Sequence, residues 1–340
     1  MQANPVRLRK RAAVLNLALI AATLASLVLA GMVGSVTVSL SEIPGALLEL
    51  LRGEASSLAA TLLDLRLSRA LVAFVTGASL SLAGVMMQAL LRNPLADPYV
   101  LGISAGASVG ALAALFFACA AWMVDSAAFV SAVVVSILLY TLARRDLRGG
   151  AAADGGTALL LLTGQIFSSV CIALVTLMLS IAPESRLRSM VFWLIGELAG
   201  APLRLLPWLV LAAVLVFTLR NARALNVMAL HAEASATLGI RVGTLRKSLF
   251  FCSALLTATS VTSAGSIGFV GLIIPHACRF AFGPDHRLLV PAATLAGGAY
   301  LVLTDIVART IIAPQQLPVG VITALIGAPV FLYQLHRLRK

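Results

Sequence analysis

Long apolar blocks restrict the fold of this 340-residue chain more than any other feature. A helix needs about 20 apolar residues to cross the roughly 30 Å hydrocarbon core of a bilayer. Here 60% of the residues are hydrophobic and only 11% are charged, too little charge to cover a water-soluble surface. The sequence therefore predicts an all-α membrane protein with about ten transmembrane helices. The candidate segments are residues 13–33, 67–90, 101–122, 126–143, 157–181, 202–219, 247–267, 268–282, 288–312 and 317–336.

Small and helix-breaking residues mark two kinds of segment. In the first kind, Gly102, Gly106 and Gly110 recur every four residues, which leaves one helix face bare for close packing. The second kind is the interrupted run of residues 262–284. Irregular backbone at membrane depth is tolerated only where protein or a water-filled cavity receives its polar groups, so we predict a broken helix that forms a wall or gate of a passage. Its interrupting residues are Gly265, Gly268, Gly271 and Pro275.

The net charge of +12 would suggest a nucleic-acid partner if the chain were soluble. Ten crossings, however, would place most of the 25 basic residues on one side, together with both termini. Basic residues gather on the cytoplasmic side of membrane proteins, so we expect cytoplasmic termini and no nucleic-acid binding. The arginines left for the outer side need another explanation; they are Arg52, Arg66, Arg69, Arg186, Arg188, Arg204 and Arg309.

Three polar stretches are expected to lie outside the spans. Residues 34–66 are predicted to form an outer loop, and the Gly-rich residues 144–156 an inner linker between two halves of a single permease domain, residues 1–340. Residues 220–247 are predicted to form the longest inner loop. Within it, the apolar spacing from Asn226 to Leu238 favours a short amphipathic helix on the cytoplasmic face, with Gly239 in the position that ends a helix.

The chain lacks the motifs that would give it chemistry of its own. It contains no GxxxxGK[ST], and therefore no usual site for a nucleoside triphosphate, and no HExxH or CxxC to suggest a metal site. Asp305 is the one acid well inside a predicted span, and Arg309 follows four residues later, so a structural ion pair is expected. An ion-coupled secondary carrier that uses Asp305 is the alternative. An intramembrane enzyme would need a paired nucleophile and base, and we identify none.

Motifs along nearly the whole chain resemble those of the FecCD-type permeases, the membrane subunits of ABC importers for iron-siderophores, haem and cobalamin. The most specific are NPLADP at residues 93–98 and FVGLIIPH at 269–276. Further matches are FWLIGELAG (192–200), EASATLGI (233–240), GPDHR (283–287), TDIVAR (304–309) and LPVGVITALIGAPVFLYQL (317–335).

The resemblance implies a type II ABC importer permease that dimerises and binds no cofactor itself. Its implied partners are two cytoplasmic ATPase subunits, which use ATP and Mg, and a periplasmic binding protein that delivers cargo. In relatives, outer arginines form salt bridges with that binding protein, and the matching residues are Arg66, Arg69 and Arg309. The stretch that relatives insert into the ATPase is matched by Glu233, Ala234, Leu238 and Gly239.

The cargo is less well specified than the family. No cluster of Met, His or Tyr lies at mid-span to ligate iron, so the passage is expected to make weak contacts with its cargo. Haem is favoured over cobalamin and ferric siderophores because Arg186 and Arg188, beside an outer span end, could attract propionate groups.

Overall fold

The computed structural model describes residues 5–39, 41–148, 154–230 and 241–338, and no strand occurs among them. In this part of the chain a helix lies on each of the ten predicted segments, so the all-α prediction is confirmed. These helices are α1 (Pro5–Met32), α3 (Leu58–Leu91), α4 (Ile103–Phe116), α5 (Ala121–Arg148), α6 (Asp154–Ile181), α8 (Leu205–Arg220), α11 (Val242–Ala264), α12 (Val270–Phe282), α13 (His286–Thr310) and α14 (Val319–Leu338).

The helices differ in their capacity to cross a bilayer. Among the described residues, α1, α3, α5, α6 and α13 are each long and apolar enough to span it alone. A sixth span results if α8 is joined to α9 (Ala222–Leu230), which follows it with a bend of 62°. The apolar helices α4, α12 and α14 are shorter. At 1.5 Å per residue, the 13 residues of α12 extend only about 20 Å, which fits the prediction of a broken helix.

The outer loop predicted at residues 34–66 is largely helical, and that prediction is wrong. It contains α2 (Ile43–Leu51), with Pro44 in its first turn, and α3 already begins at Leu58. Pro is favoured in the first helical turn because its missing N–H has no partner there. Ala46 of α2 packs in a small cluster with Ala60 and Leu63 of α3, and this burial holds α2 against the longer helix.

Two further boundaries were also misjudged. The linker predicted at residues 144–156 is mostly helical, because α5 continues to Arg148 and α6 starts at Asp154. The helix expected from Asn226 begins earlier, at Ala222, and α9 is described as far as Leu230. Polar residues near a span end do not stop a helix that extends beyond the hydrocarbon core, since water can receive its side chains.

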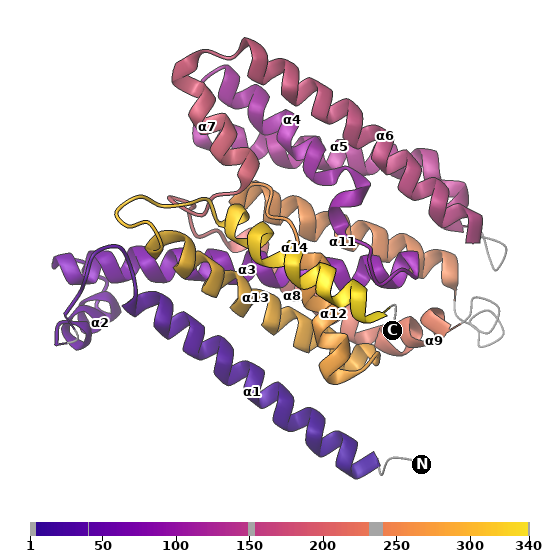
Figure 1. Ribbon diagram of the computed structural model, residues 1–340, viewed down its shortest axis with the longest axis horizontal. Coiled ribbons are helices and arrows are strands. Elements are labelled where there is room, and N and C mark those ends of the chain that lie inside the picture. The colour runs from indigo at the N-terminus through magenta and orange to yellow at the C-terminus, as the bar shows by residue number, and fades with distance from the viewer. Residues whose placement is uncertain (1–4, 40, 149–153, 231–240, 339–340) are drawn as a thin grey trace.

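A twelve-residue helix, α7 (Glu184–Ile195), was not predicted at all, and the short 3-10 turn η1 (Pro98–Leu101) precedes α4. Figure 1 shows α7 and α2 towards one end of the bundle, and α9 towards the other. The start of α1 and the end of α14 both lie towards the end that carries α9. This arrangement agrees with an even number of crossings.

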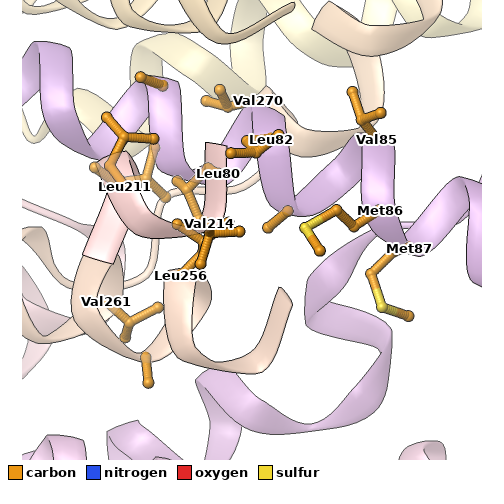
Figure 2. Close-up of a cluster of buried hydrophobic side chains, with 14 of the residues drawn as sticks. Leu80, Leu82, Val85, Met86, Met87, Leu211, Val214, Leu256, Val261 and Val270 are labelled. Atoms are coloured by element: carbon orange, nitrogen blue, oxygen red, sulfur yellow. The ribbon is translucent and has the colours of Figure 1, made fainter. Parts of the chain in front are cut away.

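Helix α3 is the centre of the bundle and packs against α1, α8, α11, α12 and α13. Figure 2 shows side chains of α3, including Leu82 and Met86, in one cluster with residues of α8, α11 and α12. Small residues bring the backbones together, as expected where helices associate by packing. A Cβ added at Gly84 would lie 2.8 Å from the Cα of Gly271 in α12, and one at Gly77 would lie 2.7 Å from the Cβ of Leu301 in α13.

Candidate functional site

Charged residues meet where the first turns of α3 and the last turns of α13 approach each other, on the side that is expected to face outward. Arg69 of α3 binds Asp305 of α13 with two nitrogens: Nη2 lies 2.7 Å from Oδ1, and Nε donates to Oδ1 and Oδ2 at 2.9 and 3.1 Å. The Nη1 of Arg69 donates to Oε1 of Gln316 at 2.6 Å. Arg309 also faces Asp305, but its Nε is 3.8 Å from Oδ2. The predicted Asp305–Arg309 pair is therefore present, and Arg69 is the closer partner.

Arg66 and Arg309 also hold the end of α1. Arg66 donates to the carbonyl oxygens of Gly31 and Met32 at 3.2 and 3.1 Å, and to that of Val36. Arg309 donates from Nη2 to the carbonyl of Ala30 at 2.7 Å. The last carbonyls of a helix have no partner within it, and cations near them are favoured by the helix dipole. Both arginines are almost fully buried as a result, with 7% and 4% of their surface exposed.

We call Arg66, Arg69, Asp305, Arg309 and Gln316 the outer charge cluster. It borders a cavity of about 500 Å³ whose other wall is the connection between α7 and α8, residues 198–203. Arg66, Arg69 and Arg309 line the cavity, and its described lining contains no acidic residue, so it can receive an acidic group. The docking of Arg66, Arg69 and Arg309 to a binding protein stays a prediction, since their observed contacts all lie within the chain.

Glu197 lies beside this cavity, in the connection that follows α7. Partial burial raises the pKa of its carboxyl, because an ionised carboxylate loses hydration there, while Arg69 and Arg188 oppose the rise. The carboxyl of Glu197 thus interacts electrostatically with Arg69 of the outer charge cluster and with Arg188 of α7. Glu197 lies within the FWLIGELAG motif, but no local pattern marks it as a site residue.

The two arginines proposed to attract a carboxylate each make a contact within the chain. Arg186 donates from Nη1 to the carbonyl of Phe116, at the end of α4. Arg188 lies over the ring of Phe192, with 5.3 Å between its guanidinium carbon and the ring centroid. Arg186 therefore fastens α7 to α4. Arg188 lies close enough to the outer charge cluster that it and Arg69 both oppose the rise in the pKa of Glu197.

The predicted break lies between α11 and α12, at residues 265–269. Gly265 has φ +69° and ψ −164°, a conformation open almost only to glycine. A Cβ on Gly265 would lie 3.0 Å from the Cα of Gly196, and one on Gly196 would lie 2.8 Å from the carbonyl oxygen of Ser266. Gly320, at the start of α14, donates its N–H to the carbonyl of Gly196 at 3.3 Å. We call Gly196, Gly265 and Gly320 the glycine seam.

Polar groups freed by the break find partners inside the protein. The N–H of Ile267 donates to the hydroxyl of Tyr99 at 3.1 Å, and the hydroxyls of Ser104 and Ser266 are 2.9 Å apart. The break is therefore a packed joint between α4, η1 and α12. Irregular backbone survives in a membrane only when it is satisfied in this way.

The remaining predicted gate residues have different surroundings. Gly271 packs against α3 and η1, and a Cβ there would lie 2.9 Å from the carbonyl oxygen of Leu80. Pro275 has no N–H for the carbonyl of Gly271, four residues earlier, and the side-chain amide of Gln88 is 3.4 Å from that oxygen. Gly268 alone has open space, with no atom within 4 Å of an added Cβ. A role of these residues as a gate stays a prediction.

At the opposite end of the bundle, α9 is joined to α13. Asn226 donates from Nδ2 to Oδ1 of Asp285 at 2.6 Å, and its Oδ1 accepts from the N–H of His286 at 2.8 Å. Burial alone would raise the pKa of Asp285, but hydrogen bonds from the Arg287 N–H and from Asn226 outweigh it and lower that pKa. The predicted ATPase contacts Glu233, Ala234, Leu238 and Gly239 lie outside the described residues.

Sequence reasoning missed the residues that complete these joints. Gln88, Tyr99, Asn226 and Gln316 are single polar residues, and their partners lie far away in the chain. A polar side chain within an apolar run, as at Gln88, was the one available signal.

Comparison with known proteins agrees with this architecture. The sequence profile of the FecCD transport family matches residues 19–337. The chain is 37% identical over 282 residues to the vitamin B12 import system permease protein BtuC of Escherichia coli O9:H4, covering 82% of this chain and 84% of that protein. It is 39% identical over 277 residues to the cobalamin import system permease protein BtuC of Halobacterium salinarum, covering 80% and 72%.

Solved structures of transporter subunits share this fold. A chain described as an inward-facing conformation of a metal-chelate type ABC transporter superposes with a TM-score of 0.82, at 30% identity over 95% of this chain and 98% of its own. A chain of PsaBC from Streptococcus pneumoniae, in complex with Fab, has a TM-score of 0.52 at 15% identity and shares the fold alone. The broken-helix bundle is thus that of a membrane-spanning subunit of an ABC importer. More specifically, the chain belongs to the FecCD transport family.

Proposed function

We propose that the chain is the translocating subunit of an ATP-driven cobalamin importer in the cytoplasmic membrane. One observation carries the choice of cargo: permeases named for vitamin B12 or cobalamin import match about four fifths of this chain, at 37% and 39% identity. In this proposal two copies of the chain, two cytoplasmic ATPase subunits and a periplasmic binding protein act together. The energy comes from the ATPase partners, since the chain has no GxxxxGK[ST] motif of its own.

Alternating access is the proposed mechanism, and α13 is suited to transmit the movement. Asn226 ties α9, on the proposed ATPase side, to the start of α13 at Asp285. Asp305 ties the far end of the same helix to Arg69 of α3. The two aspartates are separated by about 30 Å of helix, with Pro291 in its second turn, and α13 can carry a movement between the parts of the protein attached to its two ends. A displacement at α9 therefore reaches the outer charge cluster.

Cobalamin replaces haem as the favoured cargo. The preference for haem depended on Arg186 and Arg188 as ligands of propionate groups, but Arg186 binds the carbonyl of Phe116 and Arg188 lies over Phe192. Asp305 likewise serves as a partner of Arg69. Its contacts support a structural role, and membership in an ABC-importer family favours ATP over an ion gradient as the energy source.

Reconstituted uptake tests this proposal. The chain is placed in liposomes with its ATPase and binding protein, and labelled cyanocobalamin, haem and a ferric siderophore are offered in turn. We expect uptake of cyanocobalamin that requires ATP on the side of the liposome membrane where the ATPase subunits are bound.

Two results would contradict the proposal, each in a different part. Uptake of haem or the siderophore in place of cobalamin would reject the cargo. Uptake that continues with a catalytically inactive ATPase would reject the energy source.

A further inference from the structure

A second cavity, of about 410 Å³, lies away from the outer charge cluster, between the outer ends of α5 and α8. Both helices pack against α11, which forms the floor between them. The residues that line the cavity come from the first turns of α5, from the start of α8 and from the last turns of α11. We call this cavity the α5–α8 groove.

The rim of the groove carries one charge of each sign. Arg204, the residue directly before α8, forms a salt bridge from Nη2 to Oδ2 of Asp125 in α5. The side chains remain 32% and 20% exposed. Arginine has five N–H donors and a carboxylate has two acceptor oxygens, so this single contact leaves donors and acceptors of both residues free for a ligand.

The rest of the groove combines an interfacial aromatic residue with an apolar slope. Trp122 on the rim is 68% exposed, and tryptophan is enriched where hydrocarbon meets headgroups. Val130 and Leu206 line the groove and are 58% and 54% exposed, which is the pattern of side chains that face acyl chains. On the floor, the hydroxyl oxygen of Thr262 is buried and has no hydrogen-bond partner within the described residues.

We propose that the α5–α8 groove binds one phospholipid whose headgroup carries both a phosphate and a primary ammonium, such as phosphatidylethanolamine. The phosphate binds Arg204, the ammonium binds Asp125, and an acyl chain lies along Val130 and Leu206. Charge complementarity selects this occupant: Arg204 and Asp125 together are neutral, so a purely anionic headgroup meets a repelling carboxylate, whereas a zwitterion satisfies both charges. The hydroxyl of Thr262 can donate to an ester oxygen.

Native mass spectrometry of the purified chain, titrated with phosphatidylethanolamine or phosphatidylglycerol, tests the proposal. For the unmodified chain we expect about tenfold tighter retention of one phosphatidylethanolamine than of one phosphatidylglycerol, because two charge-assisted contacts replace one. Asp125→Asn should abolish this preference, because the ammonium loses its partner, and Arg204→Gln should weaken the retention of both lipids, because both phosphates lose theirs. Arg52→Gln is the matched control, since Arg52 is exposed at the end of α2 and lies outside the groove.

A second variant keeps the test valid if the charge changes disturb folding. Val130→Trp leaves Arg204 and Asp125 intact but fills the apolar slope, and it should also release the lipid. Equal retention of both lipids by the unmodified chain would overturn the proposal. So would retention that Arg204→Gln and Val130→Trp leave unchanged, or loss of a dimer in Arg204→Gln without loss of lipid, which would assign the groove to a second copy of the chain.

Discussion

The outer charge cluster and the glycine seam join distant parts of the chain by opposite means. In the cluster, α1, α3 and α13 are held together by long charged side chains that reach across the space between helices. In the seam, the connections after α7 and α11 and the start of α14 touch mainly through backbone atoms. The first joint can adjust by side-chain rotation, whereas the second leaves no room for a Cβ.

Because of this difference, the two regions should be destabilised by different kinds of substitution. A buried charge is stable only with its partner, so the cluster depends on the balance between Asp305 and its arginines. The seam depends on backbone geometry, which only glycine supplies at Gly265. Removal of charge should therefore break the first region, and addition of a methyl group should break the second.

Asp305→Ala should have the largest effect, because it leaves the buried Arg309 and the partly buried Arg69 without their shared carboxylate. Loss of one partner of a buried ion pair destabilises a protein by about 3–5 kcal/mol. We expect a lower midpoint of unfolding in a denaturant titration of the detergent-solubilised protein. Asp64→Ala is the control, as Asp64 lies on the same helix as Arg69 but is exposed. Equal stability of Asp305→Ala and the parent chain would contradict the assigned pairing.

Gly265→Ala should have the next largest effect. The backbone conformation at Gly265, with φ +69° and ψ −164°, costs a non-glycine residue about 1–3 kcal/mol. The new Cβ would also press against Gly196. Thermal unfolding followed by circular dichroism measures this loss. The matched control is Gly268→Ala, three residues along the same break, where an added Cβ meets no atom within 4 Å. If both variants melted at the same temperature, the seam would not be the rigid joint described here.

Much of the fold was predictable because the bilayer imposes a simple rule. Apolar runs located all ten main helices, although only five of them are long and apolar enough to span the bilayer alone, and the break was expected where glycine and proline interrupt an apolar run. The same rule explains the errors at α2 and α7. Both are short helices outside the spans, so no requirement for apolar length marks them, and polar residues around α2 and within α7 suggested loops.

The sites were less predictable than the helices because their contacts are long-range. The spacing of Asp305 and Arg309 on one helix suggested their pairing, yet the closer partner, Arg69, lies 236 residues away. Similarly, Arg66 was expected to form a salt bridge with a binding protein, and nothing in its neighbourhood predicts that it caps the end of α1. Local sequence shows that a charge needs a partner in the membrane, but only the packing of helices selects the partner.

Gln88→Leu should have the smallest effect of the three. It concerns a third contact between helices, in which one side chain donates to a backbone carbonyl that lacks its usual N–H donor. Gln88 donates over a long distance, 3.4 Å, to the Gly271 carbonyl that Pro275 leaves without a donor. Loss of such a hydrogen bond costs about 1 kcal/mol, measurable as a shift in the midpoint of chemical unfolding.

Pro275→Ala supplies the internal control, because it restores a backbone N–H at the position that normally bonds the Gly271 carbonyl. In that background Gln88→Leu should change the unfolding midpoint less than it does in the parent chain. The difference between the two backgrounds is the coupling free energy of the pair. Identical effects of Gln88→Leu with and without Pro275 would mean that Gln88 acts through packing alone, and that α12 tolerates an open carbonyl beside α3.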